Sequence, residues 1–179
     1  MTEKTKKLTN IYLIDEQRTY LPEITERFQN PFKYSVISYT TLSKFFEDFE
    51  SVQHPRKNLN LVFLTIEFEK DDEHVNKYLE SIPRIKNMGS NSEVFILSFK
   101  MDEEKGKKGL NYGARALIQK NENAVLRITN NIKGIISEKN LEKKRRSSLL
   151  SIKVLILFIL AVALMTVILY LIFPERFLV

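Results

Sequence analysis

The sequence feature that most constrains this chain is an unbroken apolar segment from Val154 to Phe173. It contains no charged residue, no Gly and no Pro, and as an α-helix it would reach about 30 Å, the hydrocarbon thickness of a bilayer. Apolar residues surround the helix axis, which disfavours a buried core helix with one polar face. The C-terminal position argues against a cleaved signal peptide. The segment therefore predicts a transmembrane helix at 154–173 that tethers a soluble domain to a membrane as a tail anchor.

Basic residues cluster directly before this segment. Residues 8–132 hold 17 Lys and Arg against 18 Asp and Glu, whereas residues 133–153 hold 7 against 2. The cluster consists of Lys143, Lys144, Arg145, Arg146 and Lys153. Positive residues flank membrane helices on the cytoplasmic side, so we expect a cytoplasmic N-terminal domain and contact between these side chains and anionic lipid headgroups. Nucleic-acid binding is disfavoured, because the predicted domain has no basic excess.

The composition also limits the chemistry. The chain has no Cys and only two His residues, His54 and His74. Disulfides and thiolate metal sites are excluded, and a His-based metal site or catalytic triad is disfavoured. We identify no set of nucleophile and base and no phosphate-binding glycine loop, so we expect no enzymatic activity and no cofactor.

The N-terminal part alternates short apolar runs with segments of helical periodicity. The runs predict strands at 11–14, 34–39, 59–66, 94–98 and 116–118. Helices are expected between them, with Pro83 bending or ending the third and Gly106 and Gly109 making 102–112 a poor helix. This order predicts an α/β fold, a doubly wound five-stranded parallel sheet of flavodoxin-like topology.

The predicted organisation has five parts. They are a flexible N-terminal tail at 1–9, the α/β domain at 10–138, a basic juxtamembrane linker at 139–153, the transmembrane helix at 154–173 and a short outer tail at 174–179. The linker is open to a second interpretation, a helical extension of the last helix of the domain into the membrane.

Several short motifs occur in the order found in receiver domains. Asp15 and Glu16 follow the first strand, and Ser98 ends the fourth. Gly113-Ala114 precede the fifth strand, and Lys120 follows it. In these motifs residues 10–138 resemble the receiver domain of two-component response regulators, the CheY-like superfamily. The resemblance implies an acidic pair that holds Mg²⁺, and a hydroxyl and a Lys that bind a phosphoryl group.

The sequence departs from this pattern where the phosphorylated Asp would stand. Thr65 occupies that position at the end of the third strand, and a Thr cannot form an aspartyl phosphate. Asn121 and Leu117 stand where receivers often have a Pro and an aromatic residue. The chain is therefore interpreted as a pseudo-receiver with a degenerate pocket formed by Asp15, Glu16, Thr65, Ser98 and Lys120.

Two further roles are open for the acidic residues. Glu67 lies two residues after Thr65, so Asp15, Glu16 and Glu67 could form a three-carboxylate cation site for Mg²⁺, or Glu67 could be a solvated loop residue. Lys120 is expected to form a structural ion pair with Asp15 rather than to act in catalysis.

These observations leave several functional hypotheses. The first is a membrane-tethered, phosphorylation-independent adaptor in signal transduction at the cytoplasmic face of a bacterial inner membrane. The resemblance implies a binding face near 102–136, and the partner could be an integral membrane complex or a second copy. The alternatives are a cation- or ligand-responsive switch that uses the acidic pocket, and specific packing of the apolar helix with other membrane helices.

Overall fold

The computed structural model describes residues 9–51, 58–89 and 91–172, without the side chains of 143, 146–151 and 168–172. Of the N-terminal tail predicted at 1–9, residues 1–8 lie outside the described residues, and Thr9 belongs to a strand rather than to a tail. The predicted outer tail at 174–179 also lies outside the described residues. Nearest the N-terminus, the described chain begins directly with a strand.

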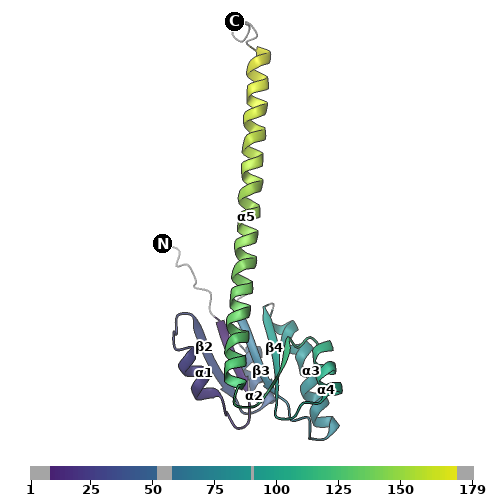
Figure 1. Ribbon diagram of the computed structural model, residues 1–179. Helices are drawn as coiled ribbons and strands as arrows, with labels where there is room; N and C mark the ends of the chain where they lie inside the picture. The colour runs from purple at the N-terminus through teal and green to yellow at the C-terminus, as the bar shows by residue number, and fades with distance from the viewer. Residues whose placement is uncertain (1–8, 52–57, 90, 173–179) are drawn as a thin grey trace. The chain divides into compact units, whose positions relative to one another are not determined.

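Five strands form one parallel sheet (Figure 1). They are β1 (Thr9–Ile14), β2 (Tyr34–Tyr39), β3 (Leu59–Thr65), β4 (Ser92–Ser98) and β5 (Ala116–Gln119). Their order across the sheet is β2-β1-β3-β4-β5, the flavodoxin-like order. The strand order and the parallel pairing confirm the predicted five-stranded parallel α/β fold. The apolar runs indicated this fold because strands buried on both faces are typical of parallel sheets.

Five helices connect or follow the strands. They are α1 (Leu21–Arg27), α2 (Leu42–Ser51), α3 (Asp72–Met88), α4 (Glu103–Asn111) and α5 (Ala124–Ile172). Two of them begin at an Asp whose carboxylate accepts a backbone N–H of the first turn, Asp71 from His74 at 2.7 Å and Asp102 from Lys105 at 2.9 Å. The helix after β1 begins with Leu21 and Pro22, where the missing N–H of Pro costs no hydrogen bond.

The expectation that Pro83 ends its helix was wrong, whereas the helix expected near 102–112 is present despite its two glycines. Pro83 lies inside α3, which continues to Met88, because the fully buried Ile82 and Ile85 anchor the helix on both sides of it. Gly106 and Gly109 lie in α4 and are buried. A Cβ on Gly109 would come within 2.3 Å of Ile96 Cδ1, so the glycines let α4 approach the sheet closely.

The hydrophobic core covers both faces of the sheet. Side chains two apart on a strand share a face, and Ile14, Leu64 and Ile96 face a cluster filled by α2 and α3. The alternate positions, such as Phe63 and Phe95 with ring centroids 4.7 Å apart, are also fully buried. This second face is left to α1 and the first turns of α5, where Ile24 and Ile128 are completely buried.

The chain divides into two compact units, Met1–Ile132 and Lys133–Val179. In the second unit the helical backbone runs through 139–153 to Ile172, which agrees with the helical interpretation of the linker. The transmembrane helix predicted at 154–173 is not found: among the described residues, no helix is both long enough and apolar enough to cross a membrane.

Candidate functional site

The predicted site residues come together at the carboxyl edge of the sheet. Parallel strands end at the same edge, and the register sets Thr65 beside Leu97 and Ser98 beside Gln119. Asp15 follows β1 and Lys120 follows β5, whereas Thr65 and Ser98 are the last residues of β3 and β4. The carboxyl ends of four strands therefore supply the polar groups. Ligand sites of open α/β sheets lie at this edge.

Lys120 forms the expected ion pair with Asp15. Its Nζ lies 3.1 Å from Oδ1 and 3.2 Å from Oδ2, and the two side chains are 0% and 8% exposed. Asp15 also accepts the backbone N–H of Thr19 at 3.2 Å. The rings of Phe99 and Tyr20 lie 4.3 and 5.6 Å from Nζ. A carboxylate and two aromatic faces thus balance the buried ammonium without an added ligand.

Ser98 is bonded within its own loop. Its hydroxyl donates to the Lys100 carbonyl at 2.8 Å, and the residue is 1% exposed. Gln119 donates to the neighbouring Phe99 carbonyl at 3.3 Å. The hydroxyl is therefore directed along the β4–α4 loop rather than toward an external ligand.

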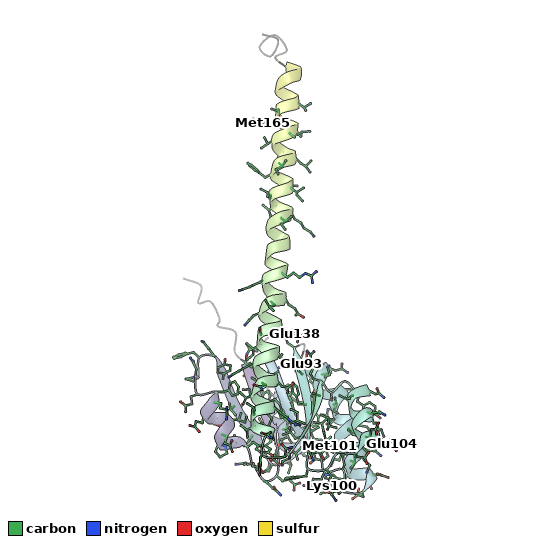
Figure 2. The ribbon with its side chains drawn as sticks, in the orientation of Figure 1. Glu93, Lys100, Met101, Glu104, Glu138 and Met165 are labelled. Atoms are coloured by element: carbon green, nitrogen blue, oxygen red, sulfur yellow. The ribbon has the colours of Figure 1, made fainter. Side chains whose placement is uncertain are left out.

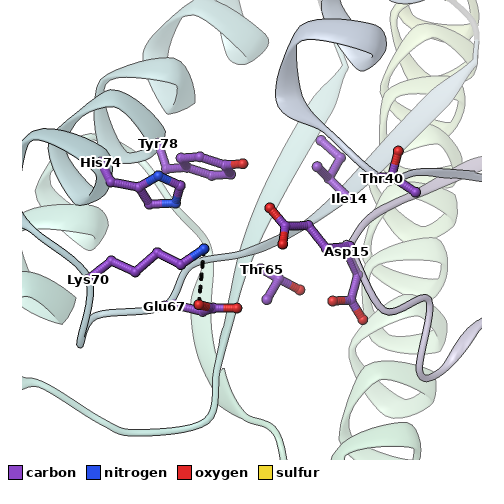
Figure 3. Close-up of a pocket in the computed structure, with 9 residues that line it drawn as sticks. Ile14, Asp15, Thr40, Thr65, Glu67, Lys70, His74 and Tyr78 are labelled. Atoms are coloured by element: carbon purple, nitrogen blue, oxygen red, sulfur yellow. Dashed lines mark ion pairs between the residues drawn. The ribbon is translucent and has the colours of Figure 1, made fainter.

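A small cavity of about 20 Å³ lies beside Thr65 (Figure 3), with space for only one or two water molecules. It is lined by Ile14, Asp15, Glu16, Thr40, Thr65, Glu67, Lys70, His74 and Tyr78. Thr65 Oγ1 is buried and makes no hydrogen bond to any described residue. Ser98 and Lys120 are not among the lining residues, and Lys120 is linked to the cavity through its ion pair with Asp15.

The cavity holds cationic as well as acidic groups. Lys70 Nζ lies 3.1 Å from Glu67 Oε2, and this hydrogen bond raises the pKa of Lys70. The rings of His74 and Tyr78 stack with centroids 4.7 Å apart, and burial raises the pKa of Tyr78. The local charge of Glu67 is therefore balanced by a lysine of the same loop.

The predicted three-carboxylate cation site is not found. In the part of the chain that the structure describes, no group of three or more His, Asp or Glu side chains is placed to hold a metal ion. Asp15 is paired with Lys120 and Glu67 with Lys70, so two of the three carboxylates already have a cationic partner.

Sequence reasoning missed Lys70, His74 and Tyr78. The spacing of His74 and Tyr78, four residues apart, places both on one face of α3. That spacing could have paired them, but only the packing of α3 against the sheet brings them to the cavity. Of the predicted lipid-contacting residues, Lys144, Arg145 and Lys153 are exposed, and the side chains of Lys143 and Arg146 lie outside the described residues.

The two loops that flank the cavity are joined by lysines. Lys100 Nζ lies 2.9 Å from Glu69, which connects the β4–α4 loop to the β3–α3 loop. Lys105 Nζ donates to the Phe68 carbonyl at 3.0 Å and pairs with Asp72 at 2.9 Å. These contacts connect the two loops at the surface of the domain.

Solved structures with this fold are response regulator receiver domains. A CheY-like receiver domain protein from Methanospirillum hungatei superposes with a TM-score of 0.56 and 18% identity, over 76% of this chain and 99% of that one. A two-component response regulator from Clostridium difficile gives 0.55 and 16%, over 74% and 98%. A response regulator from Thermotoga maritima gives 0.52 and 20%, over 70% and 98%.

No protein-family model and no curated protein sequence matches the chain. At these identities the likeness to solved structures concerns the fold alone. The chain thus has the fold of a receiver domain, and none of these comparisons indicates an enzyme family.

Proposed function

We propose that this protein is a phosphorylation-independent pseudo-receiver, tethered to a membrane, that acts as an adaptor for a protein complex at the cytoplasmic face. The observation that carries the proposal is the state of the three key positions. Thr65 stands at the phosphoacceptor position, Lys120 is bonded to Asp15, and Ser98 is bonded to the Lys100 carbonyl.

The chemistry at Thr65 supports phosphorylation independence. A hydroxyl becomes a nucleophile when a base accepts its proton, and no described residue forms a hydrogen bond with Thr65 Oγ1. The space beside it is about 20 Å³, which is small for a phosphoryl group and its counterion. The residues that would bind phosphoryl oxygens are also engaged within the chain.

The second unit supports membrane attachment. The large apolar side chains from Ile152 to Val167 are each at least 50% exposed. They lie on all sides of the helix (Figure 2, where Met165 is labelled). A continuous apolar surface of this kind needs a cover in water. The preceding basic residues fit an anionic lipid surface better than a second apolar helix, so we assign the cover to a membrane with the domain on its cytoplasmic side.

The adaptor role is assigned to the face near 102–136. Leu110 of α4 and Leu126 of α5 are 44% and 51% exposed, and Met101, which precedes α4, is 47% exposed. Exposed apolar residues are frequent in protein-binding surfaces. An integral membrane protein complex is the partner that fits a domain held at the inner leaflet.

Phosphoryl transfer is tested with the purified full chain in detergent. We expect intact-mass measurement after incubation with acetyl phosphate and Mg²⁺ to detect no phosphoryl group, while an ordinary receiver treated in parallel gains one. Stoichiometric modification of the chain would contradict the proposal. A Mg²⁺-dependent change in melting temperature would instead support the switch hypothesis.

Tethering is tested by replacing 154–173 with an unrelated apolar helix or deleting it. We expect the replaced chain to stay in the membrane fraction and to co-purify the same neighbours, and the deleted chain to lose both. Membrane association of the deleted chain would contradict the tether. A lack of reproducible neighbours for the intact chain would contradict the adaptor role.

A further inference from the structure

The outer edge of the sheet at β2 lacks the usual protection. β2 pairs only with β1 and lies at one margin of the sheet (Figure 1). The strand reads Tyr-Ser-Val-Ile-Ser-Tyr, without a charge or a Pro. Ile37, its most exposed residue, is 38% exposed. Edge strands normally carry charges, prolines or bulges that prevent pairing with another strand.

Hydrogen bonds to β1 identify the backbone groups that point outward. The carbonyls of Lys33 and Tyr39 accept from Thr9 and Asp15, each at 2.9 Å, so odd-numbered residues of β2 face β1. The even-numbered residues Tyr34, Val36 and Ser38 therefore direct their N–H and C=O groups to the free edge. The N–H of Tyr34 donates to the Asn30 carbonyl at 2.9 Å, whereas the outward groups of Val36 and Ser38 bond to no described residue.

We propose that β2 pairs with β2 of a second copy in antiparallel orientation, with Ile37 on the two-fold axis. Opposite residues of an antiparallel pair lie on the same face, so a symmetric pair must be centred on a residue. When Ile37 is the centre, Val36 lies opposite Ser38 of the second copy. Each outward N–H and C=O of these two residues then has a partner.

The occupied N–H of Tyr34 selects this register. Centring on Val36 would set Tyr34 opposite Ser38 of the second copy, and the Tyr34 N–H already donates to Asn30. The carbonyl of Ser38 would then remain without a partner. Centring on Ile37 uses only unoccupied groups and brings the exposed Ile37 side chains together at a non-hydrogen-bonded position, where side chains are closest.

The free edge of β2 is complementary to itself, so a second copy of the chain is the partner that fits it. The unoccupied outward N–H groups of β2, those of Val36 and Ser38, are symmetric about Ile37, and the strand carries no charge that would repel an identical strand. The edge differs from the proposed adaptor face at 102–136, and the pairing depends neither on membrane attachment nor on the state of Thr65. It therefore goes beyond the proposed function.

The absence of Cys from the chain permits a direct test by single-cysteine crosslinking. The full chain in mild detergent is oxidised at low protein concentration as Ile37→Cys, Val36→Cys or Ser35→Cys, and non-reducing gels show the fraction of disulfide dimer. In the proposed register the two Cα atoms at position 37 lie about 4.5 Å apart, within disulfide range. The two copies of position 35 are offset by about 13 Å along the strands.

We expect disulfide dimers from Ile37→Cys and their loss in Ser35→Cys and Val36→Cys, with matching circular dichroism spectra for all three variants. Equal dimer formation at positions 35 and 37 would indicate random collision and would overturn the proposal. A dimer from Val36→Cys that exceeds the one from Ile37→Cys would overturn the register. A monomeric Ile37→Cys chain would overturn the pairing while leaving the membrane and phosphoryl tests unaffected.

Discussion

At the scale of single residues, the carboxyl edge of the sheet is balanced by its own side chains. The Lys120 ammonium is completely buried between Asp15 and two aromatic rings, and Lys70 pairs with Glu67 on the other side of Thr65. Thr65 Oγ1 remains without a bonding partner among the described residues. A site with its charges already matched in this way has little electrostatic need for Mg²⁺ or phosphate.

The ion pair between Asp15 and Lys120 should act as a unit in stability. Asp15→Asn leaves a buried ammonium without its counter-charge, so we expect it to lower the free energy of unfolding by about 3–5 kcal/mol. Lys120→Met should cost less, because Asp15 keeps its bond from the Thr19 N–H. The double variant Asp15→Asn/Lys120→Met should regain most of the loss. Urea denaturation of the four chains measures this cycle, and additive losses would contradict the coupling.

Two tyrosines of the core predict how stability depends on alkaline pH. Burial raises the pKa of Tyr12 to about 12, with a smaller contribution from Tyr39, and burial together with Asp48 raises the pKa of Tyr39 to about 12. In the unfolded chain both should ionise near 10.0. Above that pH the unfolded state has lost protons that the folded state keeps, so stability present below pH 10 decreases as pH rises toward 12.

Replacing both tyrosines provides the control for this pH dependence. Tyr12→Phe/Tyr39→Phe should show a smaller decrease in unfolding free energy over the same pH interval, because neither side chain can ionise. Lysines titrate equally in both chains and cancel in the comparison. Identical slopes in urea denaturation would show that these tyrosines do not control alkaline stability.

At the scale of secondary structure, the strands were predictable, and the role of the two glycines in α4 was not. The strand at 34–39 has the predicted bounds, because a short apolar run between turn residues is a local signal. Helix α4 was expected to be poor because of Gly106 and Gly109, yet these residues are needed for close packing on the sheet. Helix propensity could not indicate this close packing, because the packing depends on Ile96 of β4 and Leu117 of β5.

Three glycines should therefore respond differently to alanine. Gly109→Ala should destabilise the fold by about 1–3 kcal/mol, because its Cβ would meet Ile96, which is completely buried. Gly106→Ala should cost less, since Leu117 is only partly buried. Gly134→Ala is the matched control: no atom lies within 4 Å, so the helix should gain about 0.5–1 kcal/mol.

Thermal unfolding followed by circular dichroism measures the three effects. We expect the unfolding midpoint to fall in the order Gly134→Ala, the unchanged chain, Gly106→Ala, Gly109→Ala. A Gly109→Ala chain as stable as the Gly134→Ala chain would show that α4 can move away from the sheet without cost.

At the scale of the whole molecule, the two compact units differ in what their surfaces require. The sheet unit buries its apolar residues between two layers of helices. The second unit exposes apolar side chains along its helix, and an apolar surface of this extent is unfavourable in water. The proposed membrane tether and the paired β2 edge are separate ways in which the two units acquire partners.

The sequence by itself determined the α/β fold class, the position of most strands, a Thr rather than a carboxylate at position 65, and the concentration of positive charge before the apolar segment. These properties are encoded by neighbouring residues, either as a period or as a local composition. It also indicated the pair of Asp15 and Lys120, through its resemblance to receivers.

Only the tertiary structure decided how the site is completed and where the sheet ends. Lys120 and Asp15 are separated by 105 residues in sequence. The packing of α3 brings His74 and Tyr78 to the cavity beside Thr65, and Lys70 reaches it from the loop before α3. The free groups of β2 follow from the strand order, which places this strand at an edge. Contacts between distant segments depend on the packing of the entire domain, so no local pattern in the sequence specifies them.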